Sequence, residues 1–274
     1  MIIMYLCTML KNNRIYYLVF ALIILVTTSC SEYQKLVKSS NYELKFEKAV
    51  EYYENEDYYK SQSLLEELRS IYRGTDKAEK ISYYQAYCSY GLGEFSLAAY
   101  LFKDFARLYP SSEHTEEVEY LAAYCYYLIS PEPSIEQTYT KAAIQEFQIF
   151  LEKYPNSEKR TEANELVDKL QYKLETKAFN NAYLFFNIGD YKAAITSLKL
   201  VLTDFPDTDY REEILFTVIK SSFLLAENSV EAKKKERYKH TIDAYFTFVD
   251  NFPKSDKIKE AERFYNNSLK IIEK

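Results

Sequence analysis

The chain has 274 residues, of which 47% are hydrophobic and 28% charged, with a formal net charge of −6. This balance excludes a disordered chain and a polytopic membrane protein. Only four glycines and two histidines occur, against 29 tyrosines. So few glycines argue against a β-rich fold with many tight turns and against a phosphate-binding loop, and two histidines argue against a His-based metal or acid–base site. The acidic balance argues against nucleic acid as a partner, since clustered Lys and Arg make phosphate contacts. We therefore expect a helical protein rich in tyrosine.

Residues 1–29 have the pattern of a lipoprotein signal peptide. Lys11 and Arg14 precede an apolar run over residues 15–26, which is shorter than the roughly 20 residues that a membrane-spanning helix needs. The run ends in Thr-Thr-Ser-Cys at 27–30, similar to a bacterial lipobox, although Thr27 stands where that motif usually has Leu. We predict lipid attachment at Cys30. The alternative is an ordinary cleaved signal with an incidental cysteine.

Four prolines mark copies of one helical unit, because each follows an aromatic residue and precedes, by two residues, a Ser or Thr. The positions twelve, eight and five residues before each proline are small or apolar: Ala98, Phe102 and Phe105 before Pro110; Ala143, Phe147 and Phe150 before Pro155; Ala194, Leu198 and Val201 before Pro206; Thr241, Tyr245 and Phe248 before Pro253. A degenerate fifth copy has Arg73 in place of the proline. Steps of three and four residues place each set on one helix face. Proline ends the helix, and we expect the Ser or Thr to cap the next one.

Each unit reads as helix A, a short turn, helix B and a proline turn. Arg73 and the four prolines follow one another at spacings of 37, 45, 51 and 47 residues. The shortest spacing is close to the length of a tetratricopeptide repeat. We expect residues 130–136 and about 227–235 to lengthen two A–B turns. Residues 158–187 read as one long helix or two stacked helices, and residues 255–274 as an amphipathic capping helix. The predicted fold is all-α, a tetratricopeptide-like α-solenoid of about five helix pairs plus a C-terminal capping helix.

The order of these parts resembles the BamD family, the tetratricopeptide lipoproteins of the bacterial outer-membrane β-barrel assembly machinery. The resemblance rests on Cys30 followed by Tyr33, about five repeats, Tyr-Pro-Asn-Ser at 154–157 and Phe-Pro-Asp-Thr at 205–208. One departure is Phe or Val five residues before the proline, where tetratricopeptide repeats usually have Ala. The resemblance implies a lipid-anchored scaffold on the periplasmic face of the outer membrane. After a lipidated linker over residues 30–42, the repeats of residues 43–157 would receive unfolded outer-membrane protein segments. Residues 158–274 would bind the periplasmic domains of the barrel-forming insertase.

Tyrosine is concentrated in the N-terminal repeats, with 17 in residues 30–127 and nine in residues 128–274. Four tyrosines within residues 83–90 exceed what one buried stripe holds, so some are expected to face outward. Tyrosine combines broad apolar contact with a hydroxyl at low entropic cost, which suits peptide binding. We hypothesise a peptide-binding surface whose residues are Tyr53, Tyr84, Tyr87, Tyr124 and Tyr127. The alternative is that these tyrosines belong to the repeat core.

We expect no catalytic site, no metal and no cofactor. The paired carboxylates lie at surface helix positions, and the serines lack a nucleophile-elbow motif. Cys88 and Cys125, 37 residues apart in similar strings, are interpreted as small core residues of neighbouring repeats rather than a disulfide. An alternative function is another periplasmic tetratricopeptide lipoprotein that coordinates cell-envelope or division proteins. A glycan-capturing lipoprotein is disfavoured because such proteins stack sugars on Trp, which this chain lacks.

Overall fold

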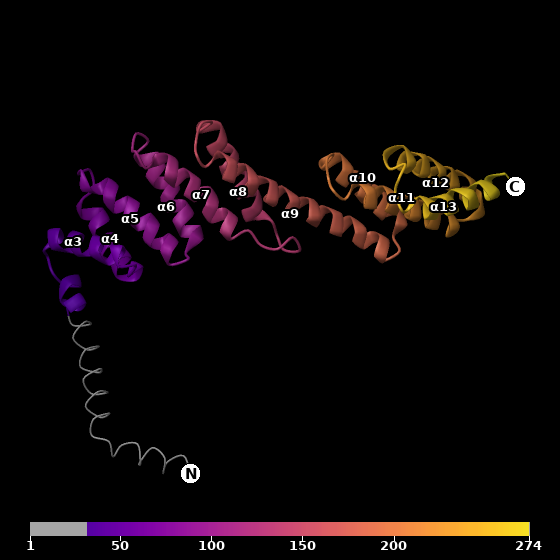
Figure 1. Cartoon of the computed structure of the whole chain (residues 1–274). Coiled ribbons are helices and arrows are strands. Elements are labelled where there is room, and N and C mark those ends of the chain that lie inside the picture. Colours follow the sequence, from indigo (N-terminus) through magenta and orange to yellow (C-terminus); the bar gives the residue numbers. More distant parts are fainter. Residues whose placement is uncertain (1–31, 274) are drawn as a thin grey trace, which may run out of the picture. The chain divides into compact units, whose positions relative to one another are not determined.

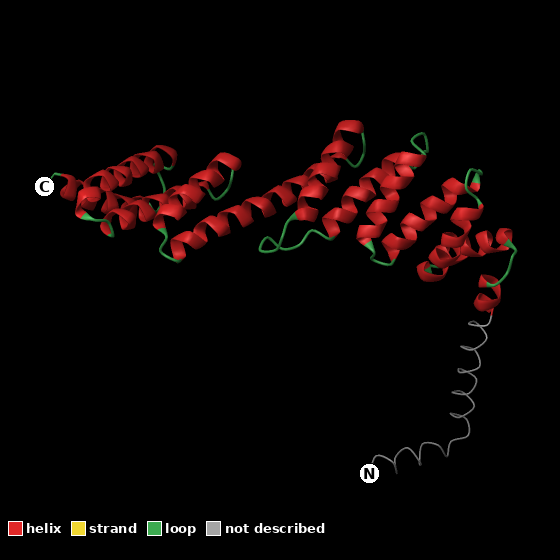
Figure 2. Cartoon of the chain, turned by 180° about the vertical axis from the view of Figure 1, so that it is seen from behind, coloured by secondary structure: helices red, strands yellow, loops and turns green. Residues whose placement is uncertain are grey.

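The computed structural model describes residues 32–273, and the regular secondary structure of that part is helical (Figure 2). The predicted signal peptide and Cys30 lie outside the described residues. Contacts divide the chain into two compact units, Met1–Cys125 and Tyr126–Lys274. Within each unit, helices that follow one another in the sequence lie side by side (Figure 1). The predicted all-α solenoid fold is confirmed.

The first unit begins, in its described part, with a short helical segment over residues 32–37. The longer helices that follow it are α3 (Tyr42–Glu54), α4 (Tyr58–Ile71), α5 (Lys77–Gly91) and α6 (Phe95–Leu108). Helix α7 (Thr115–Leu128) runs across the boundary between the units. Helix α3 packs on α4, α4 on α5, and α5 on α6. Their core includes Ala49, Leu64, Leu65, Leu68 and Ile81.

The second unit holds the remaining helices, which are α8 (Thr138–Lys153), α9 (Arg160–Asn187), α10 (Tyr191–Asp204), α11 (Arg211–Glu227), α12 (Glu231–Asn251) and α13 (Ile258–Ile272). Each packs on the next. The stretch read as one or two helices is the single helix α9 of 28 residues. The helices α3 and α4, α5 and α6, α9 and α10, and α11 and α12 pack together as A–B pairs, and α13 is the predicted final helix.

The B-helix faces are buried as the proline offsets predict. The small residues twelve positions before each mark are all 0% exposed: Ser61, Ala98, Ala143, Ala194 and Thr241. Each B helix also stops at the same place, with the aromatic residue before the proline as its C-cap. The backbone N–H of that aromatic donates to the carbonyl five positions before the proline, at 2.8 Å in all four copies. The proline turn is therefore one recurring structure.

The predicted Ser and Thr caps are wrong in position. The hydroxyl of Ser157 accepts from the Lys159 backbone N–H at 3.0 Å, and that of Ser255 accepts from the Lys257 N–H at 3.0 Å. The Lys159 amide precedes α9 and the Lys257 amide precedes α13. The two hydroxyls therefore stabilise the turn before each helix and do not cap the helix itself. Side-chain capping occurs at the A–B turns instead, where Asp190 accepts from the Ala193 N–H of α10 at 3.1 Å.

Of the two predicted insertions, only the first is a loop. Residues 129–137 connect α7 to α8, and within the second unit α9 holds this loop through Lys173 Nζ, 2.7 Å from Ser130 Oγ, and Lys177 Nζ, 2.6 Å from the Ile135 carbonyl. The expected insertion at 227–235 is wrong, because α12 begins at Glu231 and spans 21 residues. Its first turns consist of good helix formers, and Lys234 pairs with Glu231 at 3.2 Å.

The Gly91 backbone of α5 lies against the Tyr58 ring of α4. A Cβ at this position would lie 2.4 Å from Cε2 of Tyr58. Glycine to alanine near a helix end ordinarily stabilises by up to about 1 kcal/mol. Here Gly91→Ala should instead destabilise by about 1–3 kcal/mol, since the Tyr58 ring must move. Urea unfolding measures this, and the same change in a Tyr58→Ala background should be close to neutral; equal losses in both backgrounds would contradict the steric explanation.

Candidate functional site

Five tyrosine rings from three helices of the first unit form one contiguous set, here called the tyrosine layer: Tyr53 on α3, Tyr58 on α4, and Tyr83, Tyr84 and Tyr87 on α5. The Tyr53 ring centroid lies 4.7 Å from that of Tyr84, 5.9 Å from Tyr58 and 6.3 Å from Tyr87. Tyr83 and Tyr87, one helical turn apart, are 4.6 Å apart. These spacings are those of mutually stabilising aromatic pairs.

The tyrosine layer is half-buried, so it serves as both core and surface. Tyr53, Tyr58 and Tyr84 pack against the hydrophobic core of the first repeats, while the Tyr87 ring lies 5.2 Å from that of Phe102. All five rings keep part of their area accessible. A ring seated on a packed core has little rotational freedom left to lose, which lowers the entropic cost of binding a ligand.

A carboxylate and an imidazole complete the layer, and the sequence patterns pointed to neither. The Tyr87 hydroxyl donates to Glu117 Oε1, and the Tyr83 hydroxyl donates to Oε2 at 3.4 Å. The His114 ring lies 4.4 Å from that of Tyr83, and its Nδ1 is 3.6 Å from Glu117 Oε2. The register of the repeats could have indicated Glu117, because it lies in the first turn of α7, the next A helix after α5.

Burial raises the pKa of the Tyr53, Tyr83 and Tyr87 phenols above the ordinary tyrosine value, and for Tyr87 the hydrogen bond to Glu117 raises it further. Each phenol therefore stays protonated at neutral pH and can act as a hydrogen-bond donor. The layer offers aromatic faces for apolar contact and hydroxyls for hydrogen bonds.

The structure places the other predicted tyrosines on α7. Tyr124 is half-buried and stacks on Tyr120, with ring centroids 6.0 Å apart and an interplanar angle of 14°. Tyr127 is half-buried and falls in the second unit. Of the five residues proposed from the sequence, the structure thus brings Tyr53, Tyr84 and Tyr87 into one set. The predicted set did not include Tyr58 on α4 or Tyr83 on α5, which complete the layer.

The two thiols in the described part of the first unit are buried. Cys88 and Cys125 are both free, as interpreted from the sequence. Burial raises the pKa of Cys88 to about 11 and that of Cys125 to about 12, so both are thiols, not thiolates, at neutral pH. Within residues 32–273, no set of three or more His, Cys, Asp or Glu side chains is placed to hold a metal ion. None of the helices in that part is both long and apolar enough to cross a membrane.

Because of the tyrosine layer, we expect the stability of the first unit to fall at alkaline pH. Because the folded pKa values of Tyr53, Tyr83 and Tyr87 exceed the unfolded value of about 10, the stability they contribute is complete below that pH and is lost as pH rises above it. Tyr87→Phe should lose about 1–2 kcal/mol at neutral pH, from the hydrogen bond to Glu117, and should lose less stability than the wild type between neutral and alkaline pH.

Tyr59 provides the matched control, because it lies on α4 and is 71% exposed. Tyr59→Phe should leave the pH dependence of unfolding unchanged. Thermal unfolding of both variants and the wild type is measured from neutral to alkaline pH, by circular dichroism and by tyrosinate absorbance. Identical pH profiles for Tyr87→Phe and the wild type would contradict a raised pKa at Tyr87.

Paired helices with recurring proline turns define a tetratricopeptide-like repeat protein, a class whose stacked helices present extended binding surfaces. Residues 39–239 match the family YfiO, described as outer membrane lipoprotein, which is the BamD family domain. The chain belongs to this family of outer membrane lipoproteins. The family predicted from the sequence is therefore confirmed. No curated protein matches the chain.

Proposed function

We propose that the chain is a lipid-anchored periplasmic scaffold of the outer-membrane protein assembly complex, which binds the barrel-forming insertase and unfolded outer-membrane protein segments. The observation that carries the proposal is the tyrosine layer of the first unit, in a member of an outer membrane lipoprotein family. Cys30 would carry the lipid. Residues 43–157 would receive unfolded segments, and residues 158–274 would hold the insertase.

The chemistry of the layer supports an unfolded polypeptide as its ligand. Extended membrane-protein segments expose aromatic and aliphatic side chains together with unpaired backbone carbonyls. The rings of Tyr53 and Tyr84 offer apolar contact to the side chains, and the protonated phenol of Tyr53 can donate to a carbonyl. Because stacking on an aromatic face requires no single sequence, such a surface accepts many different segments.

Photo-cross-linking in living cells tests the proposal. A photoreactive aromatic amino acid replaces Tyr84 in the layer, Tyr59 as the exposed control on α4, or Leu200, which is 56% exposed on α10. We expect unfolded outer-membrane proteins to be captured at Tyr84 more than at Tyr59. At Leu200 we expect the cross-linker to capture a barrel protein that carries polypeptide-transport domains. Recovery of only peptidoglycan-binding or division proteins would overturn the proposal in favour of an envelope coordinator.

The anchor has its own test. Cys30→Ala should release the chain from the membrane fraction into the soluble periplasm, because Cys30 is the proposed site of the lipid. Cell fractionation followed by immunoblotting measures the distribution, with Cys88→Ala as the control that removes a buried thiol and leaves the anchor. Membrane association that persists in Cys30→Ala would contradict lipid attachment.

A further inference from the structure

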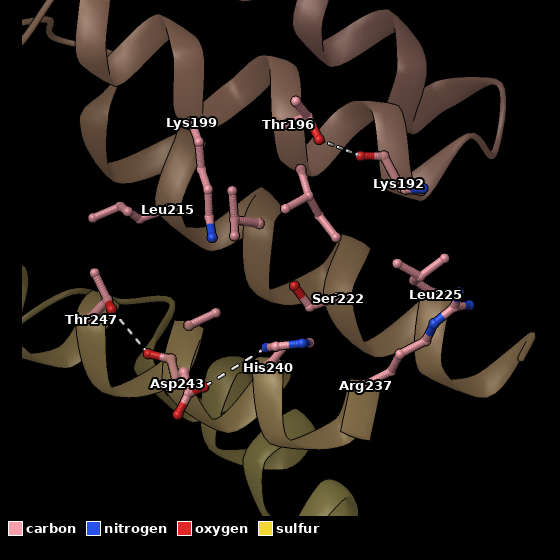
Figure 3. Close-up of a pocket in the computed structure, with 13 residues that line it drawn as sticks. Lys192, Thr196, Lys199, Leu215, Ser222, Leu225, Arg237, His240, Asp243 and Thr247 are labelled. Carbon is pink, nitrogen blue, oxygen red and sulfur yellow. Dashed lines mark hydrogen bonds and ion pairs between the residues drawn. The ribbon is translucent and has the colours of Figure 1, made fainter. Parts of the chain in front are cut away.

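A cavity of about 370 Å³ lies in the second unit, with α10 and α12 as its walls and α11 as its floor (Figure 3). This volume falls within the range of roughly 300–1,000 Å³ that is usual for ligand sites. The α12 wall is formed largely by residues beyond 239, where the family match ends. The cavity therefore includes a part of the chain that the family comparison does not cover.

Cationic groups stand at both ends of the cavity (Figure 3). Lys192 and Lys199 lie seven residues apart on α10, about 10 Å along the helix axis, and Arg237 approaches the Lys192 end from α12. Among the described residues, neither lysine side chain forms an ion pair. The Arg237 guanidinium donates to the Ser229 hydroxyl.

The cavity also contains one carboxylate and one imidazole. Asp243 Oδ2 lies 4.0 Å from His240 Nδ1, and both side chains are largely exposed, on the α12 wall. Two lysines and an arginine against one aspartate leave the lining positively charged. The complementary ligand is anionic.

Between the charged ends, the floor is apolar apart from one hydroxyl. Leu215 and Val218 on α11 are 7% and 3% exposed. Ser222 is 4% exposed, its hydroxyl points into the cavity, and it makes no hydrogen bond within the described part of the chain (Figure 3). The Ser222 hydroxyl can therefore form a hydrogen bond with a polar atom of a ligand in the cavity.

We propose that this cavity docks an extended segment of a partner protein with the pattern acidic–x–aliphatic–x–acidic. In an extended chain, residues i, i+2 and i+4 point to one face, and the outer two are about 13 Å apart. The central aliphatic side chain enters above Leu215 and Val218. One carboxylate meets Lys192 and Arg237, and the other meets Lys199, whose long side chain covers the difference in spacing.

Two separated cationic ends favour this ligand over a small anion, which could satisfy only one of them. The Ser222 hydroxyl can then form a hydrogen bond with the peptide backbone. The inference rests on the proposed scaffold function only in taking the partner to be a protein. Its test uses purified components, so its failure is distinguishable from a failure to cross-link the insertase in cells.

The test uses the purified full-length lipoprotein and a fluorescein-labelled peptide, Glu-Ser-Leu-Ser-Glu, followed by fluorescence anisotropy at low salt. We expect saturable binding that weakens as salt is added, since the ion pairs are near the surface. Peptides with both Glu replaced by Gln, or with Leu replaced by Ser, should bind at least about tenfold more weakly.

Variants of the protein locate the binding. Lys192→Glu and Lys199→Glu should each weaken binding by at least about tenfold, and both are surface changes that leave the fold intact. Lys235→Glu carries the same charge change at an exposed position of α12 outside the cavity and should bind as the wild type. Absence of saturable binding at millimolar peptide, equal binding of the Gln peptide, or equal effects of Lys199→Glu and Lys235→Glu would each overturn the proposal.

Discussion

Glu67→Ala should destabilise the first unit by about 2–4 kcal/mol, far more than the loss of an ordinary surface carboxylate. The reason lies in its partner. The Lys45 side chain on α3 is 1% exposed, and its ammonium group donates to Glu67 Oε2 at 2.6 Å and to the Val37 carbonyl at 2.8 Å. Without Glu67, a buried positive charge keeps a single carbonyl as its partner. The upper limit stays below that of a fully buried pair, because the Glu67 side chain is 43% exposed.

The matched control is Glu51→Ala, which removes a carboxylate that pairs with Lys48 at 2.6 Å on the surface of α3. Exposed pairs of this kind contribute at most about 1 kcal/mol. Adding Lys45→Met to Glu67→Ala should recover most of the stability, since the uncompensated charge is then gone. Urea unfolding of the wild type and these three variants gives the energies. Equal losses for Glu67→Ala and Glu51→Ala would show that Lys45 does not depend on its partner.

The same ion pair fixes the start of the repeat array. Through the Val37 carbonyl, Lys45 holds the helical segment of residues 32–37 against α3. Tyr33 on that segment packs edge-on to Tyr52, with ring centroids 5.8 Å apart. Hydrogen exchange in Glu67→Ala should therefore rise first in residues 32–54, because the segment loses its polar attachment while the rest of the unit stays packed.

The helix pairs could be predicted from the sequence because their marks are local. A proline after an aromatic residue, preceded by apolar positions in steps of three and four, describes a B helix and its end without any knowledge of its neighbours. Ala98, Ala143 and Ala194 are wholly buried for that reason. The positions five, eight and twelve residues before the proline lie on one face of the helix, and that face is the one that packs.

The tyrosine layer could be predicted only in part, because it depends on contacts between repeats. The excess of tyrosine pointed to Tyr53, Tyr84 and Tyr87, but their association with Glu117 and His114 requires the register of α5 against the following A helix. The cavity of the second unit left no sequence signal, because Lys192 and Arg237 come from separate helices and each resembles any solvated cation. The same limit explains the wrong boundary of α12, where the spacing of marks showed extra residues without showing that they were helical.

Phe105→Ala should destabilise the first unit by about 3–5 kcal/mol, although alanine is the usual tetratricopeptide residue at this position. Phe105 is 1% exposed, and its ring centroid lies 5.9 Å from Tyr83 and 5.1 Å from Tyr109. A helix pair spaced for a phenyl ring cannot close completely when the ring is removed, so a cavity remains. Phe105→Leu should cost less, about 1–2 kcal/mol, because most of the volume is kept.

Val201→Ala tests the same position in the second unit, where the native side chain is smaller and 4% exposed. It should cost about 1.5–3 kcal/mol, in proportion to the smaller volume lost. Phe105→Ala should have a second effect that Val201→Ala lacks, because the Tyr83 ring rests on Phe105: it should lower the pH at which the first unit unfolds in alkali. If both variants unfold within 1 kcal/mol of the wild type, roughly the scatter of surface substitutions, the helices close to the usual repeat spacing. The bulky residue would then not set the geometry on which the tyrosine layer stands.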